Sequence, residues 1–226
     1  MNHFLKKLPV KALLLSTLFI FSLPACSEPP NLTLAKNEAK NYYVSGEYQK
    51  ELTQVINEAH EYIINEAVIN QKKKQPEKLA LVLDIDETSL SNYKNMIKRD
   101  FTGTREQFHE DVMAADAPAI EPTLALYKDA IQHGIKIFFV TGRSEEERLA
   151  TKTNLKKIGY TQWTALYLRP KNYTEKTIVT FKSHARALIT KKGYTIIASI
   201  GDQRSDIKGG YVKKGFKLPN PYYYLP

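Results

Sequence analysis

The chain has 226 residues, of which 42% are hydrophobic and 25% are charged. This composition is ordinary for a globular protein and excludes wholesale disorder, and the length suits one α/β domain with a modest addition. The formal net charge is +9. Such an excess could steer phosphate-bearing substrates or reflect lysines on solvated helix faces. Without an arginine-rich cluster or interleaved aromatic residues, it does not predict a nucleic-acid partner.

The first 25 residues have the pattern of a signal peptide. Lys6, Lys7 and Lys11 precede an apolar run over residues 12–23. This run is too short to span a bilayer comfortably, but it suits the central region of a signal peptide. We therefore expect the chain to be exported.

The segment Leu23-Pro24-Ala25-Cys26 resembles a bacterial lipobox, although Pro24 is not the usual residue at its position. Cys26 is the only cysteine in the chain, so an internal disulfide is excluded. We expect lipidation at Cys26 and a tether over residues 26–32. Because Ser27 follows the cysteine, the expected place is the bacterial envelope, as an outer-membrane lipoprotein facing the periplasm or the surface. Ordinary cleavage that leaves a free cysteine, or an uncleaved anchor, is the alternative.

Residues 33–77 are predicted to form a helical segment. Apolar residues recur there at spacings of three and four, with polar residues between them. Gly46 is expected to divide the segment into two helices, and Pro76 to close it. We expect these helices to wrap around the main domain.

Residues 78–226 are predicted to form the main domain, because short apolar runs alternate there with helical patterns. Each helical pattern ends in a basic residue followed shortly by glycine, a common way for helices to stop. This alternation predicts an α/β fold, with right-handed crossovers and a doubly wound, Rossmann-like parallel sheet. An insertion over about 89–122 is expected as a small cap beyond the strand ends. The expected strands are 78–84, 134–141, 163–168 and 194–200, and the expected helices are 105–115, 123–133, 145–158 and 177–192.

Polar side chains stand at the carboxyl ends of three of these strands. Asp84 and Asp86 end the first, Thr141 ends the second, and Asp202 ends the fourth, with Asp206 four residues later. Ligands of open parallel sheets bind at this edge. Burying so many carboxylates without compensation would cost many kcal/mol, so a cation is required. A donor set made only of oxygen favours Mg²⁺.

The spacing of Asp84 and Asp86 suggests a division of roles. In an extended segment both side chains project to one side, while Ile85 points into the core. One carboxylate can attack phosphorus to form an aspartyl-phosphate, and the other can move the proton. Thr141 can donate a hydrogen bond to a phosphate oxygen. A lysine is also needed to neutralise charge, and the nearby candidates are Lys176 and Lys182.

Several motifs in this order resemble the haloacid dehalogenase superfamily in its form with four aspartates. Within it, the chain is similar to acid phosphatases of the bacterial class B and class C types, including the lipoprotein-e type. It is also similar to plant acid phosphatases and vegetative storage proteins. The motifs are Leu83-Asp-Ile-Asp-Glu-Thr88, Phe138-Phe-Val-Thr-Gly-Arg143, Lys182-Ser183, Gly201-Asp-Gln-Arg-Ser-Asp206 and Lys217-Leu-Pro-Asn-Pro-Tyr-Tyr-Tyr224.

The resemblance implies a role for each matching residue. Asp84 is expected to be the nucleophile and a metal ligand, and Asp86 the general acid–base that also gives its backbone carbonyl to the metal. Asp202 ligates the metal, and Asp206 either ligates it or orients its waters. Thr141 binds the phosphoryl group. The family places its lysine twenty residues before the aspartate of the fourth motif, in a Lys-Ser pair, which selects Lys182 over Lys176.

Further substrate contacts are predicted at Arg143 and at aromatic residues of the insertion. Arg143 could touch the substrate or open a helix as a structural arginine. Tyr93, Phe108 and His109 lie in the insertion, where family members stack aromatic residues on a nucleoside base. Core packing is the alternative for these aromatic residues.

The sequence thus predicts an Mg²⁺-dependent acid phosphatase that hydrolyses phosphate monoesters through an aspartyl-phosphate, with 5′-nucleotides as one substrate class. One alternative is a phosphotransferase that passes the phosphoryl group to alcohols or nucleosides. Another is a non-enzymatic, storage-like phosphate-binding protein, against which the presence of Asp84 argues. The sequence is compatible with a monomer and with a homo-oligomer.

Overall fold

The computed structural model describes residues 29–225. The predicted signal peptide and Cys26 lie outside the described residues. The chain divides into residues 1–31 and a unit that begins at Leu32. All helices and strands of the described residues belong to the second unit.

Two helices open this unit. Helix α1 spans Leu32–Val44 and α2 spans Glu47–Gln71. Gly46 separates them with a φ of 82°, a left-handed conformation that favours glycine. The apolar stripe of α2 is buried because it packs against the core of the main domain, as the periodicity predicts. The buried residues of this stripe include Tyr48, Leu52, Ile56, Ala59, Ile63 and Ala67.

The main domain is built on a five-stranded parallel sheet with the order β3-β2-β1-β4-β5. Its strands are β1 (Lys78–Leu83), β2 (Lys136–Ser144), β3 (Ala165–Arg169), β4 (Tyr194–Gly201) and β5 (Lys214–Lys217). This confirms the predicted α/β class and the parallel sheet. The edge strand β5 was not predicted, because only Phe216 of its four residues is buried.

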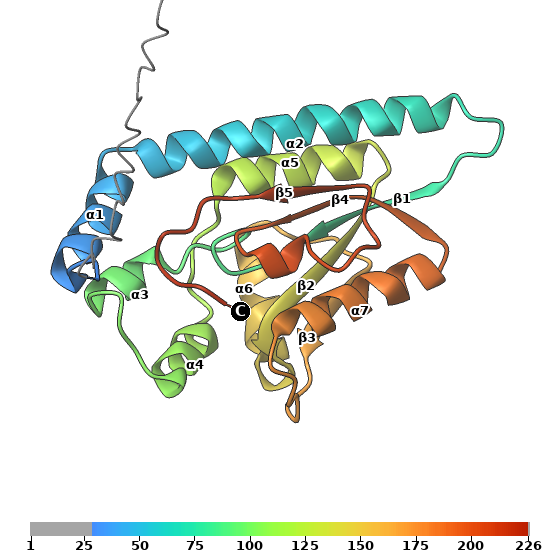
Figure 1. Cartoon of the computed structure of the whole chain (residues 1–226). Helices are drawn as coiled ribbons and strands as arrows, with labels where there is room; N and C mark the ends of the chain where they lie inside the picture. The colour runs from blue at the N-terminus through green and yellow to red at the C-terminus, as the bar shows by residue number, and fades with distance from the viewer. Residues whose placement is uncertain (1–28, 226) are drawn as a thin grey trace, which may run out of the picture. The chain divides into compact units, whose positions relative to one another are not determined.

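Helices cover both faces of the sheet (Figure 1). On one face, α2 and α5 (Glu121–Gln132) lie side by side and pack against Leu79, Leu81 and Leu83 of β1. Helix α6 (Arg148–Lys157) buries Leu155 in the same cluster. On the other face, α7 (Ile178–Lys191) packs on Ala80 and Val82. The alternation along β1 thus gives the doubly wound arrangement its two cores.

The insertion after β1 holds two helices, α3 (Tyr93–Lys98) and α4 (Arg105–Ala114), of which only α4 was predicted. Its two ends are joined by backbone hydrogen bonds, from Ser91 N to Pro118 O (3.0 Å) and from Ile120 N to Ser89 O (3.1 Å). The insertion therefore leaves and re-enters the domain at one place, next to the end of β1. Among the helices of residues 29–225, none combines the length and the apolar character that crossing a membrane requires.

Candidate active site

Three carboxylates meet at the carboxyl ends of the central strands. Asp84 follows β1 directly, Asp202 follows β4, and Asp206 lies in the short 3-10 helix Arg204–Asp206. Each offers an oxygen within 4.8 Å of the others, and all three are buried. We call these residues the carboxylate cluster. Gly201 makes room for it, because a Cβ at that position would lie 2.2 Å from the Asp206 carboxyl carbon.

Lys182 reaches the cluster from α7. Its side chain is only 2% exposed, its Nζ lies 2.9 Å from Asp84 Oδ1, and it also pairs with Asp206. Burial alone would lower the pKa of Lys182, but the carboxylates of Asp206 and Asp84 outweigh burial and raise it. Lys182 therefore stays protonated. Lys176, the other candidate, is exposed.

The cluster carries more negative charge than the protein compensates. Three carboxylates face one ammonium group, which leaves an excess of two negative charges. Burial and the Asp206 carboxylate raise the pKa of Asp84 well above its ordinary value. Burial and Asp206 also raise the pKa of Asp202. A divalent cation fits both this excess and the oxygen-only donor set.

Asp86 is not part of the carboxylate cluster and pairs with Arg143 instead. The guanidinium Nη2 lies 2.7 Å from Asp86 Oδ1, and Nε lies 3.1 Å from both carboxylate oxygens. Burial would raise the pKa of Asp86, but Arg143 and a hydrogen bond from Asn92 lower it. The Asp86 side chain keeps 27% of its surface exposed, so a substrate oxygen can reach it. Asp86 is therefore an accessible carboxylate that gains a proton only under acidic conditions.

Thr141 and Arg143 come from neighbouring positions of β2. Thr141 lies two residues beyond the last pair of the β1–β2 ladder, Leu83–Phe139, and its side chain is fully buried. Its Oγ1 accepts a hydrogen bond from the Arg143 amide (3.1 Å). The Arg143 Nη1 donates to Thr151 of α6 (3.2 Å), so both strand and helix hold the arginine in place.

The two aromatic residues predicted to contact substrate, Tyr93 and Phe108, lie in different surroundings. Tyr93 stacks on Tyr43 with ring centroids 3.5 Å apart, and it also lies close to Phe101 and Tyr222. Phe108 is 44% exposed on α4, with the Arg99 guanidinium 5.7 Å from its ring. Tyr93 thus takes part in side-chain packing, while the Phe108 ring remains open to solvent.

His109, on the same helix as Phe108, contacts Glu147 just after β2 and not the carboxylate cluster. Its Nδ1 lies 3.0 Å from Glu147 Oε1. The pair joins the insertion to the turn after β2.

Sequence reasoning missed a set of residues that hold the aspartates in place. Glu87 is buried, adopts a φ of 51°, and accepts hydrogen bonds from the Asn92 amide (2.6 Å) and Tyr223 Oη (3.0 Å). Burial, then Asp86 and Asp202, raise the pKa of Glu87 to about 8. Gln203 and Asn220 both donate to Asp202 Oδ2. Two features of the sequence could have indicated these residues. One is Glu87 inside the first motif, and the other is the group of polar residues in the Pro-rich C-terminus.

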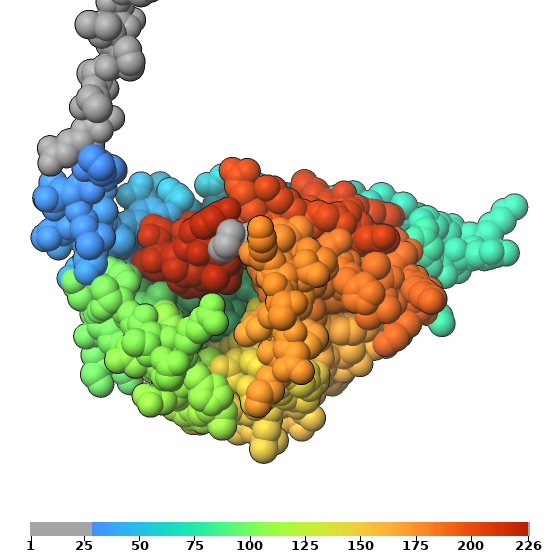
Figure 2. Space-filling model, turned by 60° about the horizontal axis from the view of Figure 1, so that its bottom comes forward, coloured from blue at the N-terminus to red at the C-terminus, as the bar shows by residue number. Residues whose placement is uncertain are grey.

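The surface is hollowed between the insertion and the start of α7. Figure 2 shows this recess between the insertion (green) and the segment before and at the start of α7 (orange), with the C-terminal residues (red) beside it.

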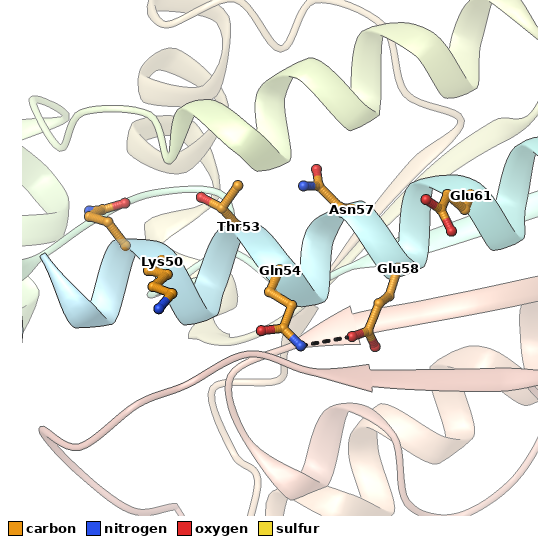
Figure 3. A pocket seen from close by; sticks show the side chains of 7 residues that line it. Lys50, Thr53, Gln54, Asn57, Glu58 and Glu61 are labelled. Carbon is orange, nitrogen blue, oxygen red and sulfur yellow. Dashed lines mark hydrogen bonds between the residues drawn. The ribbon is translucent and has the colours of Figure 1, made fainter.

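A second hollow, of about 560 Å³, lies on α2 alone (Figure 3). Figure 3 shows Lys50, Gln54 and Glu58 on this helix, with Gln54 donating to Glu58 at 3.2 Å. No second element contributes a group to its lining, so it has nothing that converges on a ligand.

Comparison with known proteins agrees with this geometry. The sequence matches the HAD superfamily, subfamily IIIB (acid phosphatase), over residues 29–226. Acid phosphatase 1 of Solanum lycopersicum is 34% identical over 190 residues, covering 82% of this chain and 72% of the relative. Vegetative storage protein 1 of Arabidopsis thaliana is 32% identical over 186 residues, covering 80% and 67%. The class C acid phosphatase from Bacillus anthracis has a similar fold, with a TM-score of 0.68, 22% identity and 85% of each chain covered. This chain belongs to the acid phosphatases of subfamily IIIB of the HAD superfamily.

Proposed function

We propose that this acid phosphatase hydrolyses phosphate monoesters through an aspartyl-phosphate on Asp84, with Mg²⁺ as its metal. The observation that carries the proposal is the buried carboxylate cluster with Lys182 at its centre. A protein gains nothing in stability from three carboxylates brought together around a single ammonium group. A site that binds both a cation and a phosphoryl group does require these carboxylates and this ammonium group.

The donor set fits Mg²⁺. Asp84, Asp202 and Asp206 would hold the ion, and the resemblance adds the backbone carbonyl of Asp86. When bound, the ion neutralises charge between the nucleophile and a phosphoryl oxygen.

The chain's own residues account for the group transfer. A carboxylate oxygen of Asp84 attacks phosphorus, and the bond between phosphorus and the ester oxygen breaks. Asp86 gives its proton to that oxygen, so that an alcohol leaves. Water then attacks phosphorus, Asp86 takes a proton from that water, and the bond between phosphorus and the Asp84 oxygen breaks, which releases inorganic phosphate and restores the Asp84 carboxylate. Lys182 and Thr141 would bind the phosphoryl oxygens.

The contact between Asp86 and Arg143 supports activity at acidic pH. The leaving oxygen needs a proton from Asp86, and Arg143 keeps the pKa of this carboxyl low. The protonated form is therefore populated only as the pH falls.

The open recess suits small phosphate monoesters of varied shape, and we include 5′-nucleotides among them. The exposed ring of Phe108 is available to a base. Tyr93 would need to leave its stack on Tyr43 to make such a contact. Transfer to an alcohol or nucleoside instead of water is the competing outcome, and product analysis with added nucleoside distinguishes it.

We also propose export and anchoring in the bacterial envelope through a lipid on Cys26, supported by the signal-like residues 1–25. A Cys26→Ser variant of an anchored protein would move from the membrane fraction to the soluble fraction.

Hydrolysis of p-nitrophenyl phosphate tests the proposed reaction, with MgCl₂, with a chelator, and with Asp84→Asn. Losing the nucleophile should lower kcat by about 10⁴-fold or more, and the chelator should remove activity reversibly. Asp116→Asn is the matched control, because Asp116 is exposed on the insertion. Equal turnover in all samples would refute the proposal.

A further inference from the structure

The last described residues of the chain lie against the active site. Residues 219–225, which we call the C-terminal strap, follow β5 and Leu218, whose amide donates to Gly201 O at the end of β4 (2.9 Å). Tyr222 holds the strap through aromatic contacts. Its ring stacks parallel to that of Phe101, with ring centroids 5.6 Å apart, and lies close to Tyr48. The strap is thus attached to the sheet at one end and to the aromatic residues of α2 and the insertion further on.

One contact of the strap reaches Asp202. Asn220 Nδ2 donates to Asp202 Oδ2 at 2.5 Å, while Asn220 Oδ1 accepts the Tyr222 amide at 2.8 Å. Because the oxygen of this side chain is already used by the strap backbone, its NH₂ group must face Asp202. The orientation of the amide is therefore set by the strap itself.

Gln203 is oriented in the same way. Its Oε1 accepts the amide of Leu225 (3.2 Å), and its Nε2 donates to Asp202 Oδ2 (2.6 Å). Two amides held by the strap thus converge on one oxygen of Asp202. The other oxygen, Oδ1, receives a longer hydrogen bond from the Thr88 hydroxyl (3.4 Å).

A second contact of the strap leads to Asp86. Tyr223 Oη donates to Glu87 Oε2 at 3.0 Å, and the Glu87 carboxylate accepts both the backbone amide and the side-chain amide of Asn92, at 2.6 and 3.2 Å. Asn92 Nδ2 donates in turn to Asp86 Oδ1 at 2.8 Å. An unbroken chain of hydrogen bonds therefore joins Tyr223 to Asp86.

We propose that the C-terminal strap positions the reacting groups: Asn220 orients Asp202 for the cation, and Tyr223 orients Asp86 for proton transfer through Glu87 and Asn92. The inference rests on the proposed function, since it assigns these two aspartates the roles proposed above. Hydrogen bonds to metal-binding carboxylates fix which oxygen and which direction they offer, and removing such a partner typically costs 10–100-fold in affinity. The strap would supply these bonds from 18 residues beyond Asp202 and from the opposite end of the domain sequence to Asp86.

Three variants of the full chain test the proposal. Asn220→Ser keeps an acceptor for the amide two residues later but is too short to reach Asp202. Tyr223→Phe removes only the hydroxyl that meets Glu87. Tyr224→Phe is the matched control, because Tyr224 is 73% exposed. Calorimetric titration with MgCl₂ should show affinity lowered about tenfold in Asn220→Ser and unchanged in the two tyrosine variants.

Steady-state kinetics test the proposed role of Tyr223 in orienting Asp86. An alkoxide needs the proton of Asp86 to leave, whereas p-nitrophenolate leaves without it. In Tyr223→Phe, kcat/KM for glycerol phosphate should fall about tenfold more than kcat/KM for p-nitrophenyl phosphate, and Tyr224→Phe should keep the wild-type ratio.

Wild-type Mg²⁺ affinity in Asn220→Ser would overturn the role of Asn220. An equal loss for both esters in Tyr223→Phe, or no loss, would overturn the role of Tyr223. A wild-type chain that binds Mg²⁺ but hydrolyses no ester would refute the proposed function instead, while the titration would still decide the role of Asn220.

Discussion

Replacing Lys182 with methionine removes the only ammonium group that contacts the carboxylate cluster within the described residues. The side chain is 2% exposed and pairs with both Asp84 and Asp206. Removing one partner of a buried ion pair costs about 3–5 kcal/mol, because the remaining charge is left uncompensated. For a domain of this size, 1 kcal/mol corresponds to about 2–4 °C in Tm. We therefore expect the metal-free variant to melt roughly 6–20 °C below wild type.

Thermal unfolding at pH 7.5, with a chelator and then with MgCl₂, measures this effect. The cation should supply part of the missing positive charge, so Mg²⁺ should raise the Tm of Lys182→Met more than that of wild type. Lys176→Met is the matched control, because the same substitution there falls on an exposed residue and should change stability by no more than about 0.5 kcal/mol. Equal melting of Lys182→Met and Lys176→Met without metal would show that the carboxylate cluster does not depend on Lys182 for charge compensation.

Two further predictions follow from the site. Arg143 lowers the pKa of Asp86, so Arg143→Gln should raise that pKa and move the alkaline limb of the pH profile of kcat/KM to higher pH; an unmoved limb would contradict the role given to Asp86. In Gly201→Ala, the new Cβ would lie 2.2 Å from the Asp206 carboxyl carbon, which should cost about 1–3 kcal/mol of stability and weaken Mg²⁺ binding. Gly142→Ala, where a Cβ meets only Ile178 at 3.7 Å, should leave the Tm close to that of wild type, and equal Tm values for both variants would count against the tight packing at Gly201.

The sheet and the position of the carboxylates were predictable for the same reason. The apolar run of β1 is long enough to identify a buried strand, and parallel strands bring the residues that follow them to one edge. The sequence alone therefore predicts that Asp84 and Asp202 lie close together. Strand β5 could not be predicted in this way, because a four-residue edge strand with one buried side chain shows no detectable alternation of apolar and polar residues.

The contacts that hold the aspartates were not predictable. Asn220 and Tyr223 lie in a proline-rich segment whose path over the domain depends on tertiary packing, chiefly of Tyr222 against Phe101. Glu87 belongs to the first motif, but its role as a hydrogen-bond acceptor for Asn92 depends on its backbone φ of 51°, which the sequence does not indicate. The sequence allows two interpretations of Arg143, and the tertiary fold places its guanidinium against Asp86.

The most direct test of the proposed mechanism is chemical trapping of the phosphorylated protein. Wild-type protein mixed with a ³²P-labelled phosphate monoester and Mg²⁺, then quenched in acid within milliseconds, should carry label on the peptide that contains Asp84. That label should be lost on treatment with hydroxylamine, as expected of an acyl phosphate, and Asp84→Asn should carry none. Ester hydrolysis by wild type without any labelled protein, or equal labelling of Asp84→Asn, would contradict the central claim that Asp84 is the nucleophile.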